Sequence, residues 1–298
     1  MNRLTVILVI MLTTGVVHAQ NTDFDTVEIK TTQLAGNLYM LEGSGGNIGV
    51  SVGEDGVFLI DSQFAELTDK IINAVAAITD EPIRYVLNTH HHPDHTGGNE
   101  NLAAHDVIIL SHENARKYMA EGNFNVVTQR ELPPLPESAL PVISFNESLT
   151  LHINGENIRA FHVDPAHTDG DAFVYFPDAN VIHVGDVFRT TSYPLVDAGA
   201  NGSFRGIMAA YKRLIDLAGP GTKILPGHGM LSTREDVQQQ LAMFETILNR
   251  VQGHIDEGRS LEEVIAATPT AEFDQRWGSG RVTGADITTV IYNELNSD

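Results

Sequence analysis

One stretch of the sequence decides the fold: Thr89-His90-His91-His92-Pro93-Asp94-His95-Thr96-Gly97-Gly98. It directly follows the apolar, β-rich run Arg84–Asn88, which predicts a buried strand. Alternate residues of an extended segment lie on the same side, so His90 and His92 can converge on one point while His91 turns away. The start of this stretch therefore predicts a pair of imidazole ligands at the end of a strand.

The second part of the stretch offers another pair of ligands. Asp94 and His95 come where the chain leaves the strand, and they can approach a point next to the first one. The alternative is a solvated, histidine-rich loop. Four histidines within six residues, with an aspartate in register and two glycines after it, favour metal binding instead. The spacing offers two ligands to each of two adjacent cations.

The composition limits what else this protein can be. Its 298 residues contain no cysteine, which excludes disulfides, thiolate metal ligands, iron–sulfur clusters and a cysteine nucleophile. A transition-metal site must then be built from the 13 histidines and from carboxylates. The 18 lysines and arginines are outnumbered by 39 acidic residues, giving a net charge of −21. Such a surface repels phosphate backbones, so we expect a small-molecule substrate and no nucleic acid as partner.

The first 19 residues resemble a secretory signal. Arg3 precedes the apolar run Leu4–Leu12, and small residues lead to a cleavage site after Ala19. The apolar run is shorter than the roughly 20 residues that a membrane-spanning helix needs. We therefore expect cleavage after residue 19, a single domain over residues 20–298, a secreted or periplasmic protein, and no stable membrane insertion. The oligomeric state is left open by the sequence.

The coarse layout alternates strands and helices in two successive blocks. The predicted strands are Asn37–Leu41, Asn47–Val52, Val57–Asp61, Arg84–Asn88, Val107–Leu110, Ser148–Ile153, Asn157–Val163, Ala172–Phe176, Val181–Val184 and Lys223–Leu225. The predicted helices are Glu66–Ile78, Ser111–Met119 with Ser111 as N-cap, Phe204–Leu217 and Arg234–Ile255. The segment Glu131–Pro141 holds four prolines and is expected to be irregular. Two sheet-plus-helix halves packed sheet to sheet predict an α/β/β/α sandwich.

Three later segments place further ligand-type residues at predicted strand ends. They are Asp164–Gly170, Val184–Phe188 and Leu225–Gly229, which contain His167, Asp186 and His228 in that order. Each residue alone is more typical of an ordinary surface loop. Together with the histidine stretch, they offer the ligand types that a hard or borderline metal prefers.

These motifs resemble those of the metallo-β-lactamase superfamily of metallohydrolases. Its HxHxDH signature is matched from His90 to His95, and its later motifs by His167, by Gly185-Asp186 and by Pro226–Gly229. The resemblance covers roughly Thr31–Ile255 and implies an αββα fold with the site at one edge of the two sheets. It also implies two Zn²⁺ ions per chain, with iron or manganese as possible replacements. The implied ligands are His90, His92 and His167 for the first metal, Asp94, His95 and His228 for the second, and Asp186 bridging both.

The substrate-binding residues follow less directly. Well-studied β-lactamases of the superfamily often have Cys or Ser where Asp186 stands, and a bridging Asp looks more like glyoxalase II and lactonases. Arg189 falls where some β-lactamases keep a Lys that binds the substrate carboxylate, although an ordinary loop cation explains it equally well. Tyr193 and Asn201 are expected to line the cleft.

The resemblance implies an exported dinuclear zinc hydrolase. A metal-bridging hydroxide would attack a carbonyl carbon of a β-lactam amide, lactone or ester, while Asp94 orients the nucleophile and returns its proton. One alternative is thioester hydrolysis of the glyoxalase II type, which export disfavours because the glutathione conjugate is cytosolic. A second alternative, from another class, is a non-enzymatic periplasmic metal-binding module.

Overall fold

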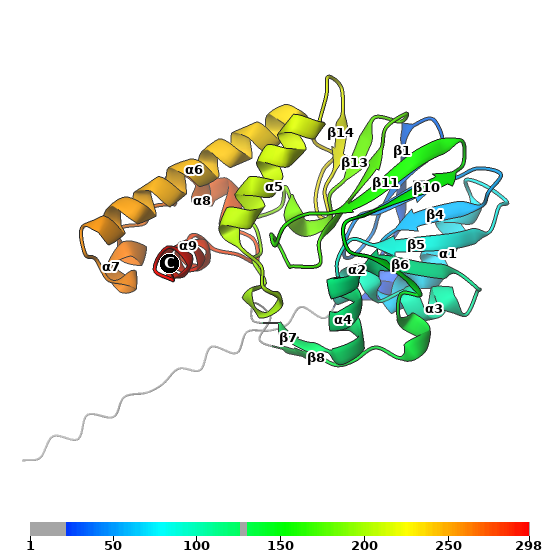
Figure 1. Cartoon of the computed structure of the whole chain (residues 1–298), viewed down its shortest axis with the longest axis horizontal. Coiled ribbons are helices and arrows are strands. Elements are labelled where there is room, and N and C mark those ends of the chain that lie inside the picture. Colours follow the sequence, from blue (N-terminus) through cyan, green and yellow to red (C-terminus); the bar gives the residue numbers. More distant parts are fainter. Residues whose placement is uncertain (1–21, 126–129, 298) are drawn as a thin grey trace, which may run out of the picture.

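The computed structural model describes residues 22–125 and 130–297, so the predicted signal segment Met1–Ala19 lies outside the described residues. The described strands form a seven-stranded sheet, a five-stranded sheet and a two-stranded hairpin (Figure 1). Among the described helices, none combines the length and the apolar character needed to cross a membrane.

The first sheet holds most of the N-terminal half. In spatial order its strands are β1 (Lys30–Ala35), β2 (Leu38–Glu42), β3 (Ile48–Ser51), β4 (Val57–Ile60), β5 (Ile83–Asn88), β6 (Ile108–His112) and β9 (Ile143–Phe145). Strands β1 to β4 pair antiparallel, whereas β4, β5, β6 and β9 pair parallel. Parallel pairing needs crossovers, which contain the helices α1 (Thr68–Ala76), α2 (Pro93–Thr96), α3 (Asn99–Ala103) and α4 (Glu113–Glu121).

The second sheet follows in the C-terminal half. Its strands, again in spatial order, are β10 (Ser148–Ile153), β11 (Glu156–His162), β12 (Ala172–Phe176), β13 (Val181–His183) and β14 (Lys223–Leu225). Helix α5 (Phe204–Leu217) connects β13 to its parallel partner β14, and α6 (Arg234–Asp256) packs against α5. The hairpin consists of β7 (Asn123–Asn125) and β8 (Arg130–Leu132).

Side-chain alternation separates the layers. On β4, Phe58 and Ile60 belong to a core shared with the second sheet, whereas Val57 and Leu59 belong to a core shared with α1. On β12, Val174 faces the first sheet and Phe173 packs in the core beneath α5 and α6. Helices thus cover the outer faces of two stacked sheets, and the predicted αββα fold is confirmed.

Three C-terminal helices were not predicted. They are α7 (Leu261–Ala266), α8 (Ala271–Trp277) and α9 (Gly284–Leu295), and they pack around the far end of α6 (Figure 1). The N-termini of α7 and α9 do carry readable signals, because Ser260 with Glu263 and Thr283 with Asp286 form capping boxes. Trp277, the last residue of α8, is buried in this region.

Two local predictions are wrong. Strand β6 continues to His112, whose side chain accepts from the Asn114 backbone N–H as the cap of α4, so Ser111 is not the N-cap. The segment Glu131–Pro141 is also less irregular than its prolines suggest, because it begins within β8 and includes a 3₁₀ turn at Glu137–Ala139.

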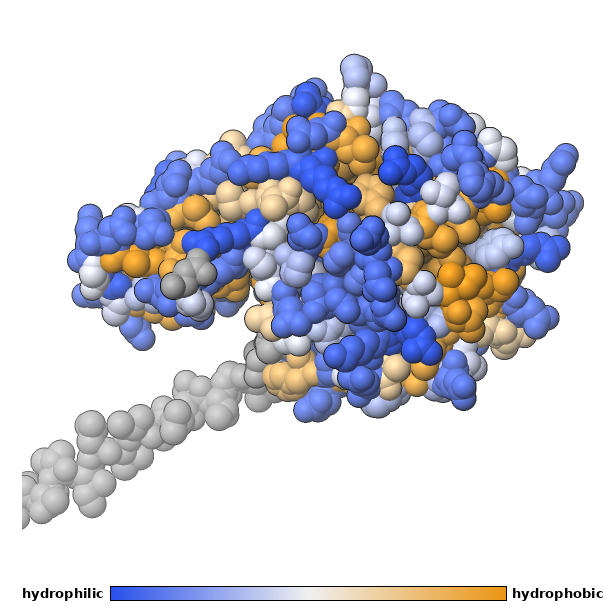
Figure 2. All heavy atoms as spheres, in the orientation of Figure 1, coloured by the Kyte–Doolittle hydropathy of each residue, from blue (hydrophilic) through white to orange (hydrophobic). Residues whose placement is uncertain are grey.

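Hydrophilic residues predominate on the face of the molecule seen in Figure 2. This agrees with the small number of large hydrophobic side chains that are exposed among the described residues.

Candidate metal centre

The predicted ligand residues meet at the strand ends of both sheets. The stretch from Thr89 to Pro93 follows β5 of the first sheet, and Asp186 and His228 follow β13 and β14 of the second. His167 lies in the loop between β11 and β12. Backbone hydrogen bonds fix these loops to one another: Gly227 N–H donates to Gly185 O over 2.6 Å, and Asn47 N–H donates to Gly227 O over 2.7 Å.

The first ligand cluster consists of three buried imidazoles. His90, His92 and His167 bring their ligand atoms within 4.8 Å of one another, and His92 Nδ1 lies 3.0 Å from His167 Nε2. The opposite nitrogen of each ring is held from outside: His90 by the Thr89 hydroxyl at 3.1 Å, His92 by Asp197 at 2.8 Å, and His167 by Leu195 O at 2.7 Å. Outer partners of this kind set the orientation of metal-binding histidines.

The second cluster combines two imidazoles with a carboxylate. His228 Nε2 lies 3.1 Å from Asp94 Oδ2 and 3.4 Å from His95 Nε2. The other nitrogen of His95 pairs with the buried Asp61 carboxylate at 2.7 Å. This cluster is more open than the first, because the side chains of Asp94 and His228 are 26% and 18% exposed.

Asp186 lies between the two clusters. Its Oδ1 is 3.3 Å from both His95 Nε2 and His228 Nε2, and its Oδ2 is 3.9 Å from His167 Nε2. Gly227 packs directly against it, and a Cβ at this position would overlap the Asp186 carboxylate. One carboxylate therefore faces both clusters, in the place that a bridging ligand requires.

The charges of the two clusters differ. Burial, together with the neighbouring His95, His167 and His92, holds the pKa of His90 well below its usual value. Burial also lowers the pKa of His95, but the carboxylates of Asp61, Asp94 and Asp186 outweigh it and raise that pKa well above its usual value. Burial likewise lowers the pKa of His167 to about 4, so His90 and His167 are neutral imidazoles, whereas the second cluster balances its imidazoles against carboxylates.

The residues present fit divalent metal ions. Within the described residues, His90 Nε2 and Asp186 Oδ1 are buried and have no hydrogen-bond partner, although both face the clusters. Leaving such atoms unpaired costs free energy unless something binds them. Three imidazoles on one side, and two imidazoles with a carboxylate on the other, are ligand sets that zinc, iron or manganese accept.

Three supporting residues were missed. Asp61 binds His95 and also accepts from Thr89 N–H at 2.7 Å, Asp197 binds His92, and Asn125 Nδ2 lies 3.1 Å from His92 Nε2. Asp61 ends a predicted strand, which is the same signal that identified Asp186. Asp197 and Asn125 lie in irregular or short segments, and the sequence offers no comparable signal for them.

The predicted substrate-binding residues have different outcomes. Arg189 lines the pocket next to the clusters and lies 4.0 Å from Asp186 Oδ2. Asn201 is exposed and donates to Asp169 Oδ2 over 2.6 Å, outside that pocket wall. The expectation for Tyr193 is wrong. Its side chain is fully buried and its hydroxyl donates to Asp274 over 2.9 Å, because the loop turns it into the C-terminal core.

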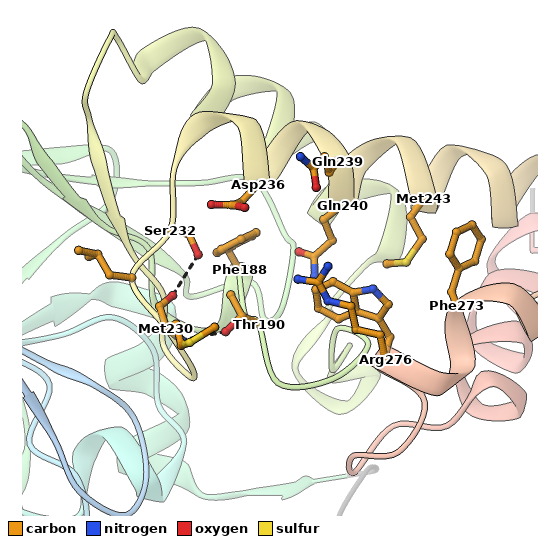
Figure 3. A pocket seen from close by; sticks show the side chains of 12 residues that line it. Phe188, Thr190, Met230, Ser232, Asp236, Gln239, Gln240, Met243, Phe273 and Arg276 are labelled. Carbon is orange, nitrogen blue, oxygen red and sulfur yellow. Dashed lines mark hydrogen bonds between the residues drawn. The ribbon is translucent and has the colours of Figure 1, made fainter.

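Two pockets share the loops that carry Arg189 and His228. The pocket at the clusters has a volume of about 260 Å³ and includes Asp94, Asp186 and His228. A second pocket lies behind these loops, against α6 and α8, and is lined by Phe188, Gln240 and Arg276, among others (Figure 3). It contains none of the seven predicted ligands, and Gln240 uses its amide to bind Arg189 O at 3.1 Å. The first pocket is therefore the candidate active site.

The comparison with family models decides the relationship. The model of the metallo-beta-lactamase superfamily matches residues 41–228, which include all seven predicted ligands. The chain belongs to the metallo-β-lactamase superfamily. The superfamily resemblance of the HxHxDH stretch is thereby confirmed.

Curated relatives match parts of the chain. A linear primary-alkylsulfatase of Pseudomonas sp. (strain ATCC 19151) is 25% identical over 225 residues, which are 63% of this chain and 42% of the relative. The alpha subunit of a 2,4-dinitroanisole O-demethylase of Nocardioides sp. (strain JS1661) is 26% identical over 117 residues, which are 39% of this chain and 33% of the relative. The chain thus spans less than half the length of these relatives.

Solved structures of the superfamily share the fold. A metallo-beta-lactamase from Pontibacter korlensis superposes with a TM-score of 0.60 at 16% identity, covering 73% of this chain and 99% of its own. A double mutant of the sec-alkyl sulfatase PisA1 gives a TM-score of 0.70 at 15% identity, covering 90% of this chain and 50% of its own.

Proposed function

We propose that this protein is a dinuclear zinc hydrolase that cleaves a carbonyl substrate, namely a β-lactam amide, a lactone or an ester. One observation carries the proposal: the Asp186 carboxylate lies between two three-ligand clusters beside an open pocket. A structural zinc site is closed by four ligands and has no use for a second cluster or for an open side. This argues against a non-enzymatic metal-binding module.

The residues around the pocket divide the remaining work. Two divalent cations bound at the clusters supply Lewis-acid chemistry and an activated water near neutral pH. Asp94 presents its partly exposed carboxylate to the pocket, 3.1 Å from His228 Nε2, where it can orient the nucleophile and hand a proton to the leaving group. Arg189 lies within reach of an anionic group on the substrate.

A second candidate function is the hydrolysis of alkyl sulfate esters. It is favoured by the similarity to two alkylsulfatases, one of which superposes on 90% of this chain whereas the Pontibacter β-lactamase superposes on 73%. Thioester hydrolysis of the glyoxalase II type has no comparable support. Iron or manganese remain candidates for the metal, because a bridging carboxylate accepts them as well as zinc.

A substrate panel on zinc-loaded protein tests the proposal. It should include chromogenic β-lactam, lactone, ester, thioester, alkyl sulfate and bis-phosphate substrates, with zinc counted per chain. We expect turnover of at least one carbonyl substrate by protein that holds two zinc ions. Turnover of the sulfate ester alone would replace the first candidate by the second. No turnover of any substrate, despite bound zinc, would favour the metal-binding module.

We also propose that the protein is exported to the periplasm or secreted. The support is the arrangement of Arg3, the apolar run Leu4–Leu12 and the small residues before Gln20. N-terminal sequencing of the protein recovered from the periplasm or the medium should give Gln20 as the first residue. Recovery of the full chain, starting at Met1, from the cytosol would contradict export.

A further inference from the structure

Three arginines surround the candidate active site. Arg130 comes from β8, Arg189 from the loop after β13, and Arg281 from the loop between α8 and α9. They reach one pocket from three distant parts of the sequence. The chain has only 18 lysines and arginines against 39 acidic residues. If charged residues were placed at random, carboxylates would outnumber cations around most pockets, so three arginines at one pocket are unusual.

The guanidinium groups of these arginines remain available to a ligand. Arg130 and Arg281 are exposed and form no ion pair with any residue that the structure describes. Arg189 is 9% exposed, and within the described residues its Nε has no hydrogen-bond partner. Among the residues that the structure describes, Asp186 is its only carboxylate within 4.0 Å, and Asp186 also faces both ligand clusters. A buried guanidinium with an unpaired donor points to a bound anion.

We propose that Arg130 and Arg281 form a two-sided clamp for an oxyanion of the substrate, and that Arg281 makes the C-terminal helices a specificity element of the active site. The oxyanion is a carboxylate or a sulfate group. This inference rests on the proposed function, because the clamp acts on the substrate of the same pocket. It goes beyond the matched superfamily segment, since Arg281 lies 53 residues after its end at residue 228.

The chemistry of the side chain fits this role. A guanidinium presents paired N–H donors that match the two oxygens of a carboxylate or sulfate, and such charged hydrogen bonds are stronger than neutral ones. Arg130 and Arg281 reach the pocket from two separate elements, since Arg130 is the first residue of β8 and Arg281 lies in the loop after α8. Their long, exposed side chains can close on an anion after it enters, while Arg189 binds from the floor.

The test compares two esters that differ only in charge. Mono-para-nitrophenyl glutarate carries a terminal carboxylate where para-nitrophenyl valerate carries a methyl group, and para-nitrophenyl sulfate provides the sulfate arm. The variants are Arg130→Gln, Arg281→Gln and the double variant. Arg276→Gln is the matched control. Arg276 belongs to α8, close in sequence to Arg281, but it stacks on Trp277 and lines the second pocket instead of the candidate active site (Figure 3).

The expected result is a change in selectivity. For the glutarate ester relative to the valerate ester, the ratio of kcat/KM should fall about tenfold in each clamp variant and further in the double variant. Arg276→Gln should keep the wild-type ratio. An unchanged ratio in the double variant, or an equal loss in Arg276→Gln, would overturn the clamp. A selective loss on the sulfate instead of the glutarate ester would support the clamp and identify sulfate as its anion.

A measurement of anion binding tests the clamp independently of the proposed hydrolytic function. If zinc-loaded wild-type protein turns over none of the three esters, the proposed function fails but the clamp is still testable. Calorimetric titration with glutarate and with inorganic sulfate should then show binding to the wild type that weakens at least about tenfold in the double variant. Equal binding by both proteins, or none by the wild type, would overturn the clamp.

Discussion

The two ligand clusters beside Asp186 are built on different principles. In the first, three buried imidazoles are each held by an outer partner, and burial lowers the pKa of His90 and of His167. In the second, Asp94 and His228 are partly exposed, and carboxylates dominate the electrostatics. The difference implies a division of labour. We expect the first cluster to hold its cation more firmly, and the second, whose Asp94 and His228 line the pocket and are partly exposed, to be the side at which the proposed substrate and protons exchange.

The largest effect should come from removing a ligand from either side. His90→Ala and Asp94→Ala should each reduce kcat/KM at least about a thousandfold and lower the bound metal. If the two clusters differ in this way, His90→Ala should also loosen the ion of the first cluster, whereas Asp94→Ala should leave that ion in place. The number of metal ions retained per chain after gel filtration measures the difference. Retention of two ions and of full activity by either variant would contradict the ligand assignment.

A methyl group can perturb the second cluster without removing a ligand. A Cβ on Gly46 would overlap the His95 imidazole, so Gly46→Ala should weaken zinc binding at the second cluster by one to two orders of magnitude, an effect of about 2 kcal/mol. Gly253 in α6 has no atom near such a Cβ, and Gly253→Ala is the control. Competition with a zinc chelator provides the readout. If both variants behave alike, Gly46 does not position His95.

Replacing the carboxylates that hold His92 and His95 from outside should reduce zinc affinity by a smaller factor. Each replacement should affect only the cluster that contains its histidine. Asp197→Asn leaves His92 without its anionic partner, and Asp61→Asn does the same for His95. Partners of this kind typically change metal affinity by about 10- to 100-fold. Stepwise zinc titration should show weaker binding of the first ion in Asp197→Asn and of the second in Asp61→Asn. The same step weakening in both variants would remove the distinction between the clusters.

The smallest effect concerns acid stability away from both clusters. His112 stacks on His162 at 3.9 Å between the two sheets, and burial, with the His162 charge, lowers its pKa to about 4. Below pH 6.5 the unfolded chain binds a proton that folded His112 does not, so the free energy of unfolding falls as the pH drops toward 4. His112→Asn, which can still cap α4, should reduce this fall by about 1 kcal/mol after allowance for solvent screening.

Urea unfolding of metal-free protein at pH 7 and at pH 5 measures this difference. Working without metal separates the titration of His112 from proton competition at the clusters. An identical pH dependence in the wild type and in His112→Asn would show that another group causes the acid loss.

The αββα fold and the convergence of the seven candidate ligand residues were predicted from the sequence because both depend on local patterns. Strand Ser148–Ile153 alternates regularly, Ala172–Phe176 is a continuous apolar run, and the candidate ligands follow strand ends that the fold brings together. The buried Tyr193 shows where this reasoning stops. Its position depends on how a loop packs against the C-terminal helices, and no local pattern encodes that contact.

The same limit applies to the pocket walls. Arg281 lies 95 residues after Asp186, in a region whose helices were not predicted, and Arg130 borders the proline-rich segment. Only the tertiary structure brings these residues to one pocket. Asp61 was partly predictable. Like Asp186, it is a carboxylate at the end of a predicted strand, but only the structure shows that it pairs with His95.

The central claim is that hydrolysis depends on two metal ions held on either side of Asp186. The most direct measurement follows hydrolysis of the best substrate while zinc is removed by chelation and added back, with metal counted per chain at each step. We predict that activity disappears as zinc is removed and returns fully only when the content approaches two ions per chain. Full activity in the metal-stripped protein would contradict the claim.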